Sequence, residues 1–135
     1  MHGDTKIVYM LEDDADDRSI TEHSVAELRL NIDIRFFSDS NRFLHFLQTA
    51  DTASLILLDY NSKPDNGLEV LKKIKSDDRH NGIPVVILSD STVKKYRAEC
   101  YAHGASSFIR KPSRVDKTNA TIKAFFDYWF HVAEV

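Results

Sequence analysis

The sequence alternates short apolar runs with amphipathic stretches, and this alternation restricts the fold more than any other feature. Five runs have the length of β-strands: residues 7–11, 32–37, 55–58, 84–88 and 106–110. The runs at 55–58 and 85–88 are apolar at every position, which is typical of parallel strands that are covered on both faces. The run at 32–37 alternates apolar and polar residues, so we expect it at an edge of the sheet.

Helical patterns separate these runs. The predicted helices cover residues 15–30, 41–49, 67–76, 92–102 and 115–133. The last of them repeats apolar residues at helical spacing, namely Ile122, Phe125, Phe126, Trp129, Phe130 and Ala133, which predicts a stripe that faces a core. A strand followed by a helix, five times over, predicts an α/β fold with a doubly wound parallel sheet between helices. At 135 residues, we expect one domain over 1–135.

Composition excludes several other classes of protein. A single cysteine, Cys100, excludes a disulfide scaffold and a thiolate zinc site, and its position on an apolar stripe favours a core thiol. No apolar run approaches the roughly 18 residues of a membrane span, and the N-terminus does not resemble a signal peptide. The net charge of −3 carries no basic excess that would favour nucleic acid. We therefore expect a cytoplasmic protein without direct membrane or nucleic-acid partners.

Polar residues follow four of the five predicted strands. Glu12 and Asp13 follow the first, Asp59 the third, Ser89 the fourth and Lys111 the fifth. In open α/β sheets, ligands bind outside the carboxyl ends of the strands. The sequence therefore predicts that three acids, a hydroxyl and a lysine converge at one edge of the sheet.

This set of side chains favours phosphate chemistry. Three carboxylates without histidine or thiolate partners form an all-oxygen site, which suits Mg²⁺. A lysine and a hydroxyl beside such a cation can pair with phosphate oxygens. Asp59, at the rim of a buried strand, could attack phosphorus and carry an acyl phosphate.

The motifs at these positions resemble the receiver domain of response regulators in two-component signalling. The matching segments are residues 9–14 (YMLEDD), 55–59 (LILLD), 67–71 (GLEVL), 84–89 (PVVILS) and 104–112. The resemblance as a whole extends from Lys6 to the last predicted helix. The resemblance implies the flavodoxin-like, CheY-like fold: five parallel strands in the order 2-1-3-4-5 with five helices. The end of the chain also resembles single-domain receivers that serve phytochrome-type histidine kinases.

The resemblance implies a phosphorylation and metal site. Asp59 matches the phosphoryl acceptor. Asp13 matches the direct Mg²⁺ ligand, and Glu12 matches the neighbouring acid that acts through water. Asn61 matches the position whose backbone carbonyl completes the metal shell.

The resemblance also implies a set of residues that respond to phosphorylation. Ser89 matches the hydroxyl residue that bonds a phosphoryl oxygen, and Lys111 matches the lysine that pairs with the acceptor or the phosphate. Pro112 matches a proline preceded by a cis bond. Phe108 occupies the aromatic switch position, where a ring without a hydroxyl would act through packing.

One loop departs from the family pattern. The family usually has a proline four residues after the acceptor. Here Lys63 occupies that position, and Pro64 follows it. Gly67 still stands at the usual eighth place, so the length of the loop is kept. We expect a reshaped loop beside the metal site.

The last predicted helix carries a second apolar line, formed by Tyr128, Val132 and Val135. Exposed apolar surface of this kind often marks an interface, although partial burial would also account for it. Receivers commonly meet partners or form homodimers through their fourth and fifth helices, and the resemblance implies the same use here.

Taken together, these features predict a receiver without an output domain. It would accept a phosphoryl group on Asp59 from the phosphohistidine of a sensor kinase or phosphotransfer protein, and signal by contact with a downstream protein. It would not be an enzyme in its own right, although it would assist its own phosphorylation and dephosphorylation. The alternatives are a pseudo-receiver that binds partners without phosphorylation, supported by the altered loop, and a phosphohydrolase, disfavoured by Asn61 where a second acid would stand. A flavodoxin-like cofactor binder lacks the glycine-rich phosphate loop.

Overall fold

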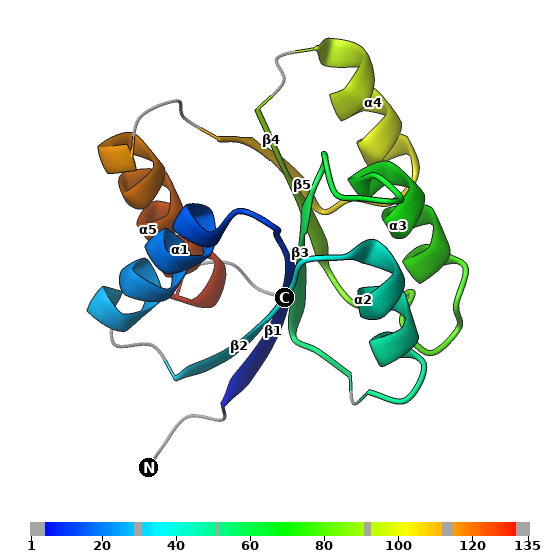
Figure 1. The fold of residues 1–135 in the computed structure, drawn as a ribbon, viewed down its shortest axis with the longest axis horizontal. Coiled ribbons are helices and arrows are strands. Elements are labelled where there is room, and N and C mark those ends of the chain that lie inside the picture. Colours follow the sequence, from blue (N-terminus) through cyan, green and yellow to red (C-terminus); the bar gives the residue numbers. More distant parts are fainter. Residues whose placement is uncertain (1–4, 29–30, 51, 91–92, 112–114, 132–135) are drawn as a thin grey trace.

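Five parallel strands form one sheet with helices on both faces (Figure 1). The computed structural model describes residues 5–28, 31–50, 52–90, 93–111 and 115–131. In chain order, the elements are β1 (Lys6–Leu11), α1 (Ala15–Leu28), β2 (Ile32–Phe37), α2 (Ser40–Leu47), β3 (Leu55–Asp59), α3 (Gly67–Lys75), β4 (Val85–Ser89), α4 (Lys94–Ala102), β5 (Ser107–Arg110) and α5 (Val115–His131). The order of strands in the sheet is β2-β1-β3-β4-β5, which confirms the predicted fold class.

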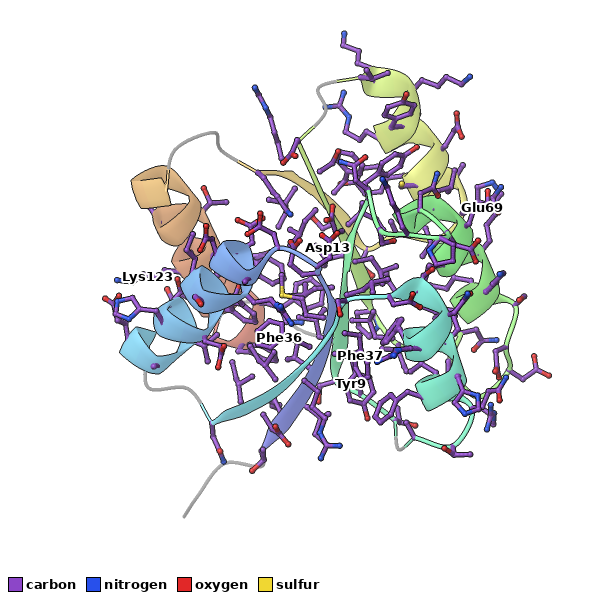
Figure 2. The ribbon with its side chains drawn as sticks, in the orientation of Figure 1. Tyr9, Asp13, Phe36, Phe37, Glu69 and Lys123 are labelled. Carbon is purple, nitrogen blue, oxygen red and sulfur yellow. The ribbon has the colours of Figure 1, made fainter. Side chains whose placement is uncertain are left out.

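The two faces of the sheet bury two separate cores. Successive residues of a strand point to opposite faces, so each buried strand contributes to both cores. Figure 2 shows this for neighbouring residues of β2: Phe36 points toward α1 and α5, whereas Phe37 points toward α2. β3 and β4 are buried along their whole length, which is the physical basis of their uninterrupted apolar sequences.

Helices α1 and α5 cover one face. Their buried residues against the sheet are Val25, Ile122, Phe126 and Trp129. These positions confirm the predicted inward stripe of the last helix as far as the structure describes it. Helices α2, α3 and α4 cover the other face with Phe43, Leu47, Leu71, Ile74 and Cys100, so the prediction of a core thiol is also correct.

Two predicted helices begin at slightly different residues in the structure. Helix α2 begins at Ser40 because the Asp39 carboxylate accepts a hydrogen bond from the Arg42 backbone N–H at 3.0 Å. Helix α4 begins at Lys94, so Val93 precedes the helix and is 46% exposed. Val93 therefore does not share the apolar stripe of this helix that buries Cys100. Residues 29–30, 92 and 132–133 of the predicted helices lie outside the described part of the chain.

Gly104 follows the C-cap of α4, His103. Its φ of 100° lies in the left-handed region that favours glycine. A Cβ there would also lie 3.3 Å from the Lys75 side chain of α3. Among the described helices, none combines the length and the apolar character needed to cross a bilayer.

Helix α3 begins in close contact with the end of β3. A Cβ built on Gly67 would lie 2.9 Å from both the Asp59 carbonyl oxygen and the Tyr60 Cα. The Gly67 N–H donates to the Tyr60 carbonyl at 2.8 Å, and the Asn66 side chain caps the helix by accepting from the Glu69 N–H at 2.9 Å. Only a residue without a side chain permits this approach of α3 to the backbone of Asp59.

We predict that Gly67→Ala lowers the free energy of unfolding by about 1–3 kcal/mol, because the added methyl group must displace backbone atoms. Gly82→Ala is the matched control, since a Cβ at Gly82 would meet no atom within 4 Å. We expect it to change the stability by less than about 1 kcal/mol. Urea unfolding of the three proteins measures both effects. Equal stabilities of the two variants would contradict the steric explanation.

An ion pair between α1 and α5 gives a prediction about pH. Lys123 Nζ lies 2.8 Å from Glu27 Oε2, and the hydrogen bond from Lys123 lowers the pKa of Glu27 below its ordinary value. A lowered pKa means that the pair stabilises the fold above the ordinary glutamate pKa, and that this contribution is lost as the pH falls through the lowered value. Glu27→Gln should therefore reduce stability at pH 7, and its difference from the unmodified chain should disappear as the pH falls through the lowered pKa of Glu27.

Urea unfolding across this pH range provides the measurement, with Glu22→Gln as the control at an exposed glutamate of the same helix. A Glu27→Gln deficit that stays constant down to the acid end, or that Glu22→Gln reproduces, would show that the ion pair is not its source.

Candidate functional site

The polar residues predicted to converge lie together at the carboxyl edge of the sheet. Four neighbouring parallel strands, β1, β3, β4 and β5, end there. At this edge lie Glu12 and Asp13 after β1, Asp59 as the last residue of β3, Ser89 as the last residue of β4 and Lys111 after β5. Figure 2 shows Asp13 in the turn between β1 and α1. The predicted convergence is correct for these residues.

Backbone hydrogen bonds extend the sheet up to the site. Glu12 N–H donates to the Phe37 carbonyl at 2.8 Å, and Tyr60 N–H donates to the Leu88 carbonyl at 2.8 Å. Lys111 N–H donates to the Ser89 carbonyl, also at 2.8 Å. The side chains of the site thus project from backbone that is held by neighbouring strands rather than from free loops.

Three carboxylates of the site form a compact cluster. Glu12, Asp13 and Asp59 each offer an oxygen, and these oxygens lie within 4.8 Å of one another. Glu12 is 1% exposed and Asp59 is also buried, whereas Asp13 faces solvent. Carboxylate oxygens at this spacing repel one another, and an oxygen-preferring divalent cation would relieve that repulsion. The residues present therefore fit a magnesium ion.

Lys111 is the cation that faces this cluster. Its Nζ lies 2.5 Å from Glu12 Oε1, 3.1 Å from Asp17 Oδ2 and 3.7 Å from Asp59 Oδ2. Burial raises the pKa of Glu12 to about 7, against the opposing effect of the Lys111 hydrogen bond. Burial also disfavours the charge of Lys111, but its hydrogen bond to Glu12 and the charge of Asp59 keep the pKa of Lys111 above its ordinary value. Lys111 is therefore an ammonium ion at neutral pH.

The two oxygens of Asp59 have different neighbours. Oδ1 accepts a hydrogen bond from the Asn61 backbone N–H at 3.1 Å, and Oδ2 faces Lys111. Asn61 itself is exposed. Its predicted role as a metal ligand through the carbonyl stays a prediction.

The two predicted switch residues lie on neighbouring strands. Ser89 is completely buried at the end of β4. Phe108 is half-buried against the core beneath α2, α3 and α4, and its backbone N–H donates to Tyr101 Oη at 3.0 Å. This bond connects β5 directly to α4. The switching roles of both residues stay predictions.

The β3–α3 loop, where the sequence departs from the family pattern, is fastened to the start of α2. Ser40 N–H donates to the Lys63 carbonyl at 2.9 Å, and Ser40 Oγ accepts from the Asp65 N–H at 2.9 Å. The Lys63–Pro64 peptide bond is cis, which the sequence analysis did not anticipate. The cis bond that it did predict, before Pro112, lies outside the described residues.

Sequence reasoning missed two features of the site. Asp17 is not among the residues predicted for the site, yet the first turn of α1 brings it to Lys111. Its position in the sequence could have indicated this contact, because Asp17 lies in the first turn of the helix that follows Glu12 and Asp13. Tyr60, which follows Asp59, stacks on Tyr96 of α4 with ring centroids 4.9 Å apart.

Exposed apolar side chains lie on and beside α4 and on α5, and they include Tyr128 of the predicted interface. Among the described residues, the large exposed hydrophobic side chains are Val93 at 46%, Tyr101 at 47% and Tyr128 at 55%. They belong to α4, its N-cap and α5. Val132 and Val135, the other two residues of the predicted interface, lie outside the described ranges.

Comparisons with known proteins agree with this geometry. The family model of the response regulator receiver domain matches residues 8–123. The two-component response regulator ORR11 of Oryza sativa subsp. indica is 30% identical over 107 residues, which are 79% of this chain and 71% of that protein. ORR5 of Oryza sativa subsp. japonica is 29% identical over 110 residues, which are 82% of this chain and 81% of that protein.

Solved structures show the same fold over almost the whole chain. The phosphorylated cyanobacterial phytochrome response regulator RcpA has a TM-score of 0.91 and 26% identity, covering 97% of this chain and 98% of that one. A response regulator from Hahella chejuensis has a TM-score of 0.87 and 29% identity, covering 97% and 99%. The Mn²⁺-bound form of Rcp1 has a TM-score of 0.90 and 21% identity, covering 96% and 98%, a likeness of fold.

The family match begins in β1 and continues into α5, so it includes both the acids after β1 and the lysine after β5. On this evidence, the chain belongs to the family of response regulator receiver domains of two-component systems.

Proposed function

We propose that the chain accepts a phosphoryl group on Asp59 from a phosphohistidine, with Mg²⁺ bound beside it. The observation that carries this proposal is the environment of the Asp59 carboxylate. One oxygen is held by the Asn61 N–H, the other faces the Lys111 ammonium, and two further carboxylates lie within 4.8 Å. An aspartate in this setting is rigid, partly buried and adjacent to positive charge.

The transfer exchanges one phosphorus bond for another. A carboxylate oxygen of Asp59 attacks phosphorus, the P–N bond of the phosphohistidine breaks, and the imidazole nitrogen leaves with the electron pair. The product on this chain is an acyl phosphate. Lys111, whose Nζ lies 3.7 Å from Asp59 Oδ2, is placed to pair with oxygens of the incoming group. The hydroxyl of Ser89, at the end of the neighbouring strand, is the proposed second donor.

The carboxylates of Glu12, Asp13 and Asp59 would hold the metal ion, with the Asn61 carbonyl as the further ligand that the family resemblance implies. When bound, Mg²⁺ neutralises charge on the phosphoryl oxygens and orients the group for in-line transfer. The donor set supports this assignment because it consists of oxygen atoms alone.

The signal would leave through a protein surface, in the cytoplasm. The donor would be a sensor histidine kinase or a phosphotransfer protein, and the recipient a downstream protein or a second copy of this chain. Val93 and Tyr101 supply exposed apolar surface at α4, and Tyr128 supplies it on α5, which covers the opposite face of the sheet. The Tyr101–Phe108 hydrogen bond connects α4 to β5. Phosphorylation would act by shifting an existing equilibrium between two arrangements of these elements.

The acceptor assignment predicts that Asp59→Asn loses labelling by a small phosphodonor such as acetyl phosphate, because an amide oxygen is too weak a nucleophile to form the acyl phosphate. The unmodified chain should gain one phosphoryl group in Mg²⁺ and none in EDTA, as measured by intact-protein mass spectrometry. Asp78→Asn, at an exposed aspartate in the loop after α3, should label normally.

Undiminished labelling of Asp59→Asn would assign the acceptor to another residue. A folded, unmodified chain that neither labels nor binds Mg²⁺ would instead favour the pseudo-receiver alternative, in which the cis Lys63–Pro64 loop belongs to a module that binds partners without phosphorylation.

The metal assignment predicts that Asp13→Asn weakens Mg²⁺ binding by about tenfold or more, because it removes a charged ligand. Isothermal titration calorimetry with MgCl₂ provides the dissociation constants. Asp16→Asn removes an equal charge from an exposed position on α1 and should change the affinity by less than about twofold. If both variants bind Mg²⁺ equally well, Asp13 is not a ligand.

A further inference from the structure

Asp17 contacts the site lysine but does not belong to the carboxylate cluster proposed for the metal. Its Oδ2 accepts a hydrogen bond from Lys111 Nζ at 3.1 Å. The compact group of ligand oxygens consists of Glu12, Asp13 and Asp59. The proposed phosphoryl transfer therefore leaves Asp17 without a function, although it is one of the charged groups nearest to Lys111.

The distances around Lys111 show where its ammonium group rests. Nζ is within hydrogen-bond distance of Glu12 and Asp17, whereas Asp59 Oδ2 lies at 3.7 Å, beyond that distance. An ammonium group has three N–H donors, and two of them are directed to carboxylates other than the acceptor. The resting lysine is thus bonded on the α1 side of the site.

The start of α1 fixes the position of Asp17. Asp14 Oδ1 accepts hydrogen bonds from the Asp16 N–H at 2.8 Å and the Asp17 N–H at 3.0 Å, so it caps the helix. The Asp17 carbonyl accepts from Thr21 Oγ1 at 3.0 Å, and Thr21 is fully buried. The backbone from which the Asp17 carboxylate reaches Lys111 is therefore held by hydrogen bonds on both sides.

The two side chains of this pair differ in exposure. The Asp17 side chain is 30% exposed, and that of Lys111 is 12% exposed. Water therefore screens the attraction in part, which makes the pair weak enough to break when a stronger anion arrives. A phosphoryl group on Asp59, with its additional charged oxygens, would be such an anion.

We propose that Asp17 is a positioning residue that holds Lys111 on the α1 side of the site, so that a phosphoryl group on Asp59 must compete with Asp17 for the lysine. This inference rests on the proposed function, because it concerns the response of the same site to phosphorylation. Asp17 would set the affinity of the active form for the phosphoryl group without touching that group itself.

The test uses beryllofluoride, a phosphoryl mimic, added to the full chain in Mg²⁺ and followed by isothermal titration calorimetry. Asp17→Asn should bind beryllofluoride about two- to fivefold more tightly, the size of effect expected for releasing a partly exposed ion pair. Asp16→Asn removes the same charge from the same first turn of α1 and should bind like the unmodified chain. Asp17→Glu keeps the carboxylate and should also bind like the unmodified chain.

A double-mutant comparison shows whether Asp17 acts through Lys111. Lys111→Gln should weaken beryllofluoride binding, and adding Asp17→Asn to it should have no further effect. Urea unfolding in EDTA without beryllofluoride measures the coupling between Asp17 and Lys111 in the resting state. It compares the unmodified chain, Asp17→Asn, Lys111→Gln and the double variant. The two substitutions should shift the unfolding midpoint by less together than the sum of their separate shifts.

Three results would overturn the inference. Asp17→Asn could bind beryllofluoride with the same affinity as Asp16→Asn, or more weakly than the unmodified chain. Alternatively, Asp17→Asn could still raise the affinity when Lys111 is replaced by Gln. Failure of the unmodified chain to bind beryllofluoride in Mg²⁺ would be a different result, because it would remove the proposed phosphorylation itself. In that case the unfolding comparison in EDTA still decides whether Asp17 and Lys111 are coupled.

Discussion

The complete burial of β3 is the constraint on which the rest of the structure depends. β3 lies between β1 and β4, and Leu55–Leu58 have no exposed surface. Burying apolar area on both faces of one strand contributes to both cores at once, and it fixes the strand in depth and register. Asp59, the residue that directly follows, is therefore held at the rim of the sheet. The close approach of Gly67 to the Asp59 backbone fixes the same point from α3.

Placing acids at such a rim creates an electrostatic problem that Lys111 partly solves. Carboxylates removed from water favour their neutral form, and the raised pKa of Glu12 expresses this cost. The ammonium of Lys111 offsets part of the negative charge, but one cation faces Glu12, Asp17 and Asp59. A site with this imbalance has an affinity for further positive charge and can exchange the partners of its lysine. Both properties are what a metal-dependent phosphoryl acceptor needs.

The edge that carries the site is connected to the outer surface through aromatic residues. Tyr60, adjacent to Asp59, stacks on Tyr96 of α4, and Tyr101 of the same helix accepts a hydrogen bond from the backbone of Phe108. Helix α4 thus contacts both Tyr60, the residue that follows β3, and β5, the strand that precedes Lys111. In the proposed function, these aromatic contacts would carry a change at the edge of the sheet to α4.

The sequence by itself determined the fold class and most of the site, because both depend on local patterns. Burial on both faces requires uninterrupted apolar runs such as 55–58, and such runs predicted parallel strands. Residues that end parallel strands share an edge, so the convergence of Glu12, Asp13, Asp59, Ser89 and Lys111 followed from that prediction. The exposure of Val93, the cis Lys63–Pro64 bond with its loop tied to Ser40, and the pairing of Lys111 with Asp17 were decided by the tertiary structure. These features depend on where a helix begins and on which of several nearby partners a flexible side chain meets. Such choices are set by distances across the fold between residues as far apart in the chain as Asp17 and Lys111, and no pattern within a single segment encodes them.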